Sequence, residues 1–176
     1  MGLAASGALV ALALAAPAGA SADCSTGGVT PATTDICTPT AKAKLLRNGM
    51  VIPPAGAPAR VKLVIAAANK IRSKPYIWGG GHARWWDRGY DCSGSVSYAL
   101  HGGKFINSPL PSGPMERWGG GGKGRWITVY ANGGHAWAVI AGIRWDTSGD
   151  ASGTGPRWHK DIRSTRGYIV RHPVGY

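Results

Sequence analysis

The sequence is poor in acidic residues and contains no apolar run long enough to span a membrane. Asp and Glu together number 8 against 20 Lys and Arg, so the formal net charge is +12. A surface of this charge attracts anionic partners. The basic residues are scattered, however, and no dense basic block or nucleic-acid-binding motif occurs. The sequence therefore excludes an integral membrane segment and disfavours nucleic acid as a partner.

Metal-ligand patterns are missing too. The five histidines are dispersed and no Cys/His spacing typical of a zinc site occurs, so we expect no metal and no other cofactor. Phe occurs once, whereas Trp occurs 8 times and Tyr 6 times. Trp and Tyr join an apolar body to a polar tip and favour half-buried grooves. The 28 Gly, spread through the second half of the chain, exclude an all-helical bundle.

The first residues have the composition of an export signal. Residues 1–22 carry no charge, and Ala20-Ser21-Ala22 has the small residues of a cleavage site. We therefore predict a signal peptide over 1–22 and a secreted protein. A flexible alanine-rich terminus is the alternative. Residues 23–56 are rich in Thr, Pro, Ser and Gly and are interpreted as an N-terminal arm, followed by one domain over 57–176.

Cysteine usage agrees with export. Cys24 and Cys37 lie in the Thr/Pro-rich arm, where a disulfide between them would close a loop in an oxidising compartment. Cys92 is then left over, and an unpaired cysteine in a secreted protein suggests an intermolecular bridge or a working thiol.

The order of the elements predicts an α+β fold with an antiparallel sheet. Apolar residues at helical spacing follow Pro58, and a second helix is expected from Asp91 or Cys92 to about Leu100. A helical turn is expected over Thr40–Arg47, and residues 148–157 are expected to form a loop. The predicted strands are 125–131, 135–141, 143–147 and 167–172.

Cys92 is the first candidate for chemistry. Asp91-Cys92-Ser93-Gly94 follows a glycine-rich turn at the predicted start of a helix. The helix dipole and the free N–H groups there lower the pKa of a thiol, and the same N–H groups can bind an oxyanion. The alternatives are a buried apolar cysteine or a disulfide partner of Cys24 or Cys37.

A nucleophilic thiol needs an imidazole and a group to orient it. His135 begins a predicted strand after two glycines, and Asp146 lies on the neighbouring strand, so a cross-strand contact is expected. The alternatives are a strand-end histidine bonded to a loop carbonyl and an aspartate that only caps a turn.

These pieces together resemble the NlpC/P60 family of secreted bacterial cysteine peptidases. The matching segments are Lys74-Pro75-Tyr76-Ile77-Trp78-Gly79-Gly80, Asp91-Cys92-Ser93-Gly94 and the apolar strand that begins at His135. The resemblance covers about Ala66 to Trp145, less than half of the chain.

The resemblance implies a papain-like fold, with N-terminal helices packed on an antiparallel sheet. It implies Cys92 as nucleophile, His135 as base and Asp146 as the third residue. Tyr76 would lie beside the thiol and aid the oxyanion or substrate, with Asp91 and Ser93 at the edge of the subsite. The implied activity is cleavage of peptide bonds in peptidoglycan stem peptides.

Two other functions stay open: a catalytically silent wall-binding module of the same fold, and an amidase of the related CHAP family. In each case we expect a cell-wall-associated monomer whose basic surface meets anionic wall polymers. The basic surface also fits an ordinary solvated face. Trp85-Trp86 is a candidate stacking surface for sugar or peptide, although core packing is the commoner role of such a pair.

Overall fold

The chain, described here by a computed structural model over residues 1–2, 42–149 and 155–176, places its secondary structure in one unit formed by residues 37–176. The elements in chain order are β1 (Lys44–Leu45), β2 (Val51–Ile52), α1 (Ala59–Ile71), α2 (Cys92–Gly102), α3 (Ser112–Met115), β3 (Gly120–Gly121), β4 (Ile127–Asn132), β5 (His135–Ile140), β6 (Ile143–Asp146), β7 (Arg157–His159) and β8 (Ile169–His172).

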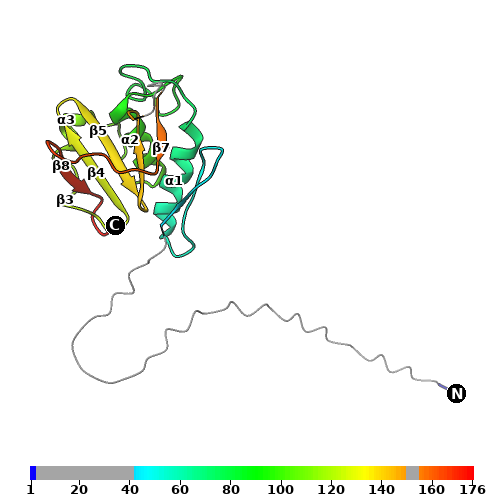
Figure 1. Ribbon diagram of the computed structural model, residues 1–176. Helices are drawn as coiled ribbons and strands as arrows, with labels where there is room; N and C mark the ends of the chain where they lie inside the picture. Colours follow the sequence, from blue (N-terminus) through cyan, green and yellow to red (C-terminus); the bar gives the residue numbers. More distant parts are fainter. Residues whose placement is uncertain (3–41, 150–154) are drawn as a thin grey trace, which may run out of the picture. The chain divides into compact units, whose positions relative to one another are not determined.

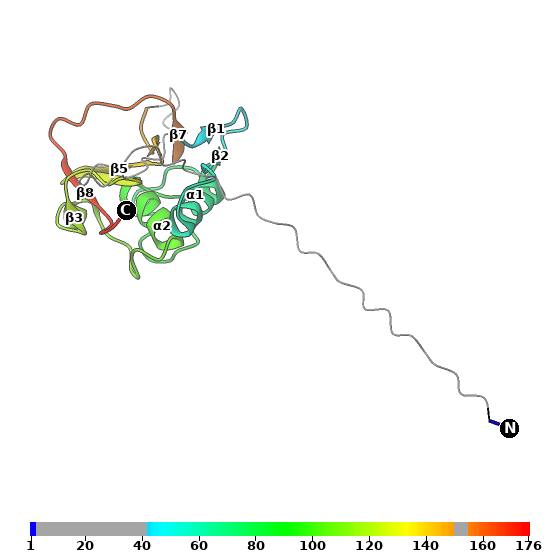
Figure 2. The same cartoon turned by 90° about the horizontal axis from the view of Figure 1, so that it is seen from below.

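The main layer is a six-stranded antiparallel sheet in the order β3-β8-β4-β5-β6-β7. Helix α2 packs on β5 and β6, and α1 packs along α2 (Figure 1). In Figure 2 both helices lie on one side of the sheet, and the connection from β7 to β8 runs over the other side. The predicted α+β class, with helices preceding an antiparallel sheet, is confirmed.

The core forms where α1 and α2 meet the sheet. The apolar positions of α1 recur at helical spacing and are buried, as Val61, Val64 and Ile71 illustrate. Each such side chain contributes roughly 1.5–3 kcal/mol by burial. Helix α2 is made mostly of small residues, and Gly102 lies so close to Ala67 that a Cβ there would collide with the alanine methyl group. Small residues therefore allow α2 to lie deep between α1 and the sheet.

Two tight turns fix the register of β4, β5 and β6. Gly133 and Gly134 form a two-residue turn between Asn132 and His135, which are Cα partners in the ladder. Ala141 and Gly142 form the next turn, both with positive φ (47° and 82°), as the twist of a two-residue hairpin requires. The expected strands near 125–131, 135–141, 143–147 and 167–172 are therefore present with slightly different ends.

The segment before α1 differs from the prediction. The expected helical turn over Thr40–Arg47 is wrong, because Lys44–Leu45 pairs with Val51–Ile52 as an antiparallel hairpin. The hairpin docks on α1, where the side-chain amide of Asn69 donates to the backbone C=O of Val51 (2.8 Å) and accepts from its N–H (2.9 Å). Asn69 and Val51 lie 18 positions apart in the sequence, so no local sequence pattern indicates that the hairpin docks on α1.

Strand β7 was not expected, because it has only three residues and follows a Gly/Pro-rich stretch. The predicted signal peptide, most of the predicted arm and the predicted Cys24–Cys37 disulfide lie outside the described residues. Within the described residues, no helix has the length and apolar character needed to cross a membrane.

Candidate active site

Cys92 is the first residue of α2. The preceding Asp91 is the N-cap of the helix, with extended backbone and a side chain that accepts from the N–H of Gly94 (2.7 Å). The thiol is free and only 8% of Cys92 is exposed. The fold thus places a single thiol at the positive end of a helix dipole, as expected from the sequence.

The turn before β5 brings His135 to this helix end. Asn132 caps the turn, because its side-chain oxygen accepts from the N–H groups of Gly134 (3.0 Å) and His135 (2.9 Å). The imidazole lies beside the thiol of Cys92, and hydrogen bonding from the imidazole and from the N–H of Ala136 lowers the pKa of the sulfur. The predicted pairing of Cys92 with His135 is therefore present as a contact.

Asp146 completes a chain of three polar groups. Its Oδ1 lies 2.9 Å from Nε2 of His135, which leaves Nδ1 for the thiol. Because Ala138 faces Trp145 in the ladder, Asp146 continues the register opposite Trp137 and lies diagonal to His135 on the same face. The side chain of Asp146 is fully buried and that of His135 is 18% exposed. The expected cross-strand contact is thus made.

Cys92, His135 and Asp146 shift one another's pKa values so that the charged form of each group is favoured. Burial raises the pKa of Cys92, but the hydrogen bonds from His135 and from the N–H of Ala136 outweigh it, so the pKa lies below its ordinary value. Burial lowers the pKa of His135, but Asp146 and Cys92 outweigh it and raise that pKa to about 9. Both shifts widen the pH range in which the pair is a thiolate and an imidazolium. Burial likewise opposes ionisation of Asp146, yet His135 and other donors hold its pKa below the ordinary value.

A loop rich in glycine forms the other wall of the site. The N–H of Gly79 donates to Oδ2 of Asp91 (3.1 Å), and the N–H of Asp91 donates to the C=O of Gly80 (3.2 Å). The loop follows Tyr76, which is bridged to Tyr90 in parallel register. Asp91 thus ties the loop to the start of α2.

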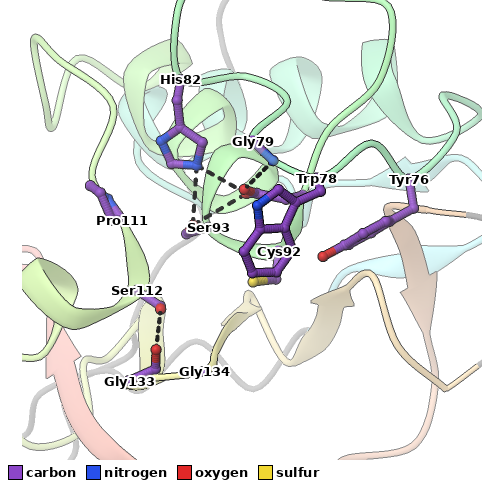
Figure 3. Close-up of a pocket in the computed structure, with 11 residues that line it drawn as sticks. Tyr76, Trp78, Gly79, His82, Cys92, Ser93, Pro111, Ser112, Gly133 and Gly134 are labelled. Carbon is purple, nitrogen blue, oxygen red and sulfur yellow. Dashed lines mark hydrogen bonds and ion pairs between the residues drawn. The ribbon is translucent and has the colours of Figure 1, made fainter.

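These walls enclose a cavity of about 300 Å³ beside the thiol, shown in Figure 3. Its lining includes Tyr76, Asp91 and Ser93, the three residues expected to bind substrate or oxyanion. Partial burial, together with the charges of Cys92 and Asp91, raises the pKa of Tyr76, so its hydroxyl keeps its proton and can donate. The other lining residues are Trp78, Gly79, His82, Cys92, Pro111, Ser112, Gly133 and Gly134.

His82 was not expected at the site. Its Nε2 lies 3.0 Å from Oδ1 of Asp91 and 3.2 Å from Oγ of Ser93 (Figure 3). It occupies a Gly/Arg/Trp-rich loop without helical or strand periodicity, so the sequence gives no signal for this position. Oδ1 of Asp91 also accepts from Gly94, so this oxygen is fully occupied by groups of the protein.

The Trp85-Trp86 pair, which was the candidate stacking surface, does not lie at the cavity. Trp85 stacks on His101 with ring centroids 3.8 Å apart and packs against the core, and Trp86 lies 4.3 Å from the ammonium of Lys74. Neither lines the cavity, whereas Trp78 does and is 85% exposed. Of the two aromatic residues that line the cavity, Trp78 is therefore more exposed than Tyr76, which is 39% exposed. Within the described residues, no group of His, Cys, Asp and Glu side chains is arranged to hold a metal ion.

Comparison with known proteins gives structural similarity only. No family model matches the chain, and no curated protein matches it by sequence. Ten solved chains match its structure. One is the peptidoglycan hydrolase RipB from Mycobacterium tuberculosis, at 27% identity and a TM-score of 0.52 over 71% of this chain and 70% of that one. The chain is thus similar in structure to a peptidoglycan hydrolase.

The role of Asp146 can be tested by Asp146→Asn. The amide keeps a hydrogen bond to the ring but cannot stabilise an imidazolium, so the pKa of His135 should fall from about 9 toward its ordinary value of about 6.5. The thiolate–imidazolium window then closes from its alkaline side. We expect the turnover of a reaction that uses the Cys92 thiolate to fall by about 10²–10⁴-fold. The alkaline limb of its pH–rate profile should move to lower pH.

The matched control is Glu116→Gln, which changes a carboxylate at the C-cap of α3 rather than one bonded to His135 or to the arginines beside Asp146. It should leave the profile in place. If Asp146→Asn folds normally by circular dichroism and keeps activity within a few-fold, Asp146 is a turn cap and not part of the site.

Proposed function

We propose that this chain is a secreted, cell-wall-associated cysteine hydrolase that cleaves peptide bonds in peptidoglycan stem peptides. The observation that carries the proposal is the hydrogen-bonded chain from Cys92 through His135 to Asp146, with its thiol at the wall of a cavity. Similarity in structure to a peptidoglycan hydrolase supports the substrate class. The resemblance to NlpC/P60 motifs supports the papain-like fold and the cysteine chemistry.

In the proposed reaction the thiolate of Cys92 attacks the carbonyl carbon of the scissile bond, and an S–C bond forms as the carbonyl oxygen becomes an oxyanion. The N–H groups in the first turn of α2 and the hydroxyl of Tyr76 donate to that oxyanion. The imidazolium of His135 then protonates the leaving amine as the C–N bond breaks. Water, deprotonated by His135, hydrolyses the thioester and regenerates the thiol.

The remaining residues of the site shape the subsite that would hold the substrate. Asp91 and Ser93 border the cavity beside the nucleophile and define the edge of the subsite. Because Asp91 accepts from Gly79, His82 and Gly94, its carboxylate fixes the wall of the subsite rather than reaching far into it. No step uses a metal or a cofactor. The net charge of +12 favours approach to anionic wall polymers, and this attraction weakens as salt screens it.

Mass spectrometry of the products from purified peptidoglycan tests the proposal. We expect shortened stem peptides with new amino and carboxyl ends, because the proposed cut lies within the peptide. The variant Cys92→Ala, which keeps the fold but lacks the nucleophile, is the blank.

Two other results would replace the proposal. Release of intact stem peptides from the glycan strand would indicate the amidase, the reaction expected of a CHAP-type enzyme. No product, together with retained binding to insoluble walls and an inert Cys92 thiol, would indicate the silent binding module.

A further inference from the structure

The connection between β7 and β8, residues 160–168, crosses the side of the sheet that faces away from α1 and α2 (Figure 2, orange to red). It contains no helix or strand, and its residues are exposed except for Arg163 and Tyr168. Both of these partly buried side chains contact the candidate site. The segment is therefore held to the sheet where the proposed catalytic groups lie.

Arg163 binds the oxygen of Asp146 that His135 does not use. Its Nη1 donates to Oδ2 over 3.1 Å, whereas Oδ1 receives His135 Nε2 (2.9 Å) and the N–H of Ser148 (3.0 Å). A second cation, the Nε of Arg144, lies 3.8 Å from Oδ2. A carboxylate with no exposed side-chain area needs such partners, because an unpaired buried charge is costly.

Tyr168 links the same arginine to the imidazole. The guanidinium carbon of Arg163 lies 5.8 Å from the centre of the Tyr168 ring, and that ring meets His135 edge-on at 6.4 Å. Arg163 thus bonds the group that orients the imidazole and lies against the ring that packs on it.

We propose that Arg163 is a positioning residue of the site: it fixes the carboxylate of Asp146 and, by sharing its charge, sets the proton affinity of His135. This inference rests on the proposed function for its meaning in catalysis, but its physical content concerns only the thiol, the imidazole and the carboxylate. The sequence gives no signal for Arg163, because it is one of many scattered basic residues and lies in a segment with no periodicity.

Charged and titratable groups approach the pair from the elements packed against it, and the nearest of them decide the sign of the effect on the pKa of His135. The cation of Arg163 opposes protonation of His135, whereas the anions of Asp146 and Cys92 favour it. Removing Arg163 leaves the negative charge of Asp146 less neutralised and should raise the pKa of His135 further. The other groups around the pair are Asp91, Tyr76 and His82 at the cavity beside the thiol, Arg144 on β6, His159 on β7, and Asp161 and Tyr168 on the connection.

The test is the pH dependence of iodoacetamide alkylation at Cys92, located by peptide mapping. This readout needs no peptidase activity, so it separates the inference from the proposed function. Alkylation should rise at the thiol pKa and again where His135 loses its proton. In Arg163→Gln we expect the upper inflection to move up by about 0.5–1 pH unit, since a full charge at 4–6 Å shifts a pKa by about 1–3 units and this one acts through Asp146. Arg163→Lys, which keeps the charge, should restore most of the wild-type profile.

Two controls make the result specific. Arg166→Gln changes an exposed arginine of the same segment, whose backbone N–H bonds Ser164, and should leave the profile unchanged. In an Asp146→Asn background, Arg163→Gln should no longer move the inflection, because the carboxylate that transmits the effect is gone. An unchanged profile in Arg163→Gln, or the same upward shift in the Asp146→Asn background, would overturn the inference. A shifted profile in a protein that leaves peptidoglycan intact would refute the proposed function alone.

Discussion

Cys92→Ala and His135→Ala should each reduce peptidoglycan cleavage by about 10⁴-fold or more, because each removes a group that the proposed reaction uses in every step. The double variant should be little worse than either single one, since a thiol without its base and a base without its thiol are both inactive. The measurement is the rate of release of new amino groups from purified peptidoglycan, with unfolding midpoints recorded for each variant.

His172→Ala is a suitable control, because it removes an imidazole from the β3–β8 end of the sheet, where the ring bonds the C=O of Gly122. It should keep the wild-type rate. A His135→Ala protein that retains activity within a few-fold would show that another group takes the proton from the thiol. Losses that simply multiply in the double variant would show that the two residues do not act as one unit.

Gly94→Ala should inactivate the protein and lower its stability, although alanine favours a helix by about 1 kcal/mol over glycine. Gly94 lies in the first turn of α2, close to the C=O of Gly80, and a Cβ on Gly94 would collide with that oxygen. It would also lie 3.1 Å from Oδ1 of Asp91. Because the neighbour is backbone, the helix or the glycine loop must move, at a cost of about 1–3 kcal/mol. The movement displaces Cys92 from His135.

The matched variant is Gly113→Ala in the short helix α3, where a Cβ meets no atom within 4 Å and φ is not positive. It should keep or slightly raise the unfolding midpoint. Thermal unfolding and the alkylation rate of Cys92 at neutral pH measure both effects. A Gly94→Ala protein with a normal midpoint and normal thiol reactivity would mean that the loop adapts without moving the nucleophile.

The helices and the central strands were predictable because their signals are local. The apolar spacing after Pro58 gives α1, and the Asn132-Gly133-Gly134 turn gives the start of β5 and therefore the position of His135. Strand alternation across Gly142 suffices to bring Asp146 near His135. Each of these inferences needs only residues that are close together in sequence.

The rest of the site depends on contacts between distant segments. Arg163 meets Asp146 from 17 positions away across an irregular connection, and His82 meets Asp91 and Ser93 through the path of a loop. Whether Trp78 or the Trp85-Trp86 pair faces the cavity depends on how that same loop folds back on α2. No periodicity encodes such paths, so the sequence offered the residue types without their placement.

The carboxylate of Asp91 joins two amides that belong to different segments, Gly79 in the loop and Gly94 in the helix. If the carboxylate of Asp91 moves away, the hydrogen bonds to both amides break together. The cavity wall at Gly79 and the first turn of α2 should therefore unfold locally as one unit. In hydrogen-exchange terms the two amides should share one opening free energy. Thermal opening of the wall should then also displace the sulfur.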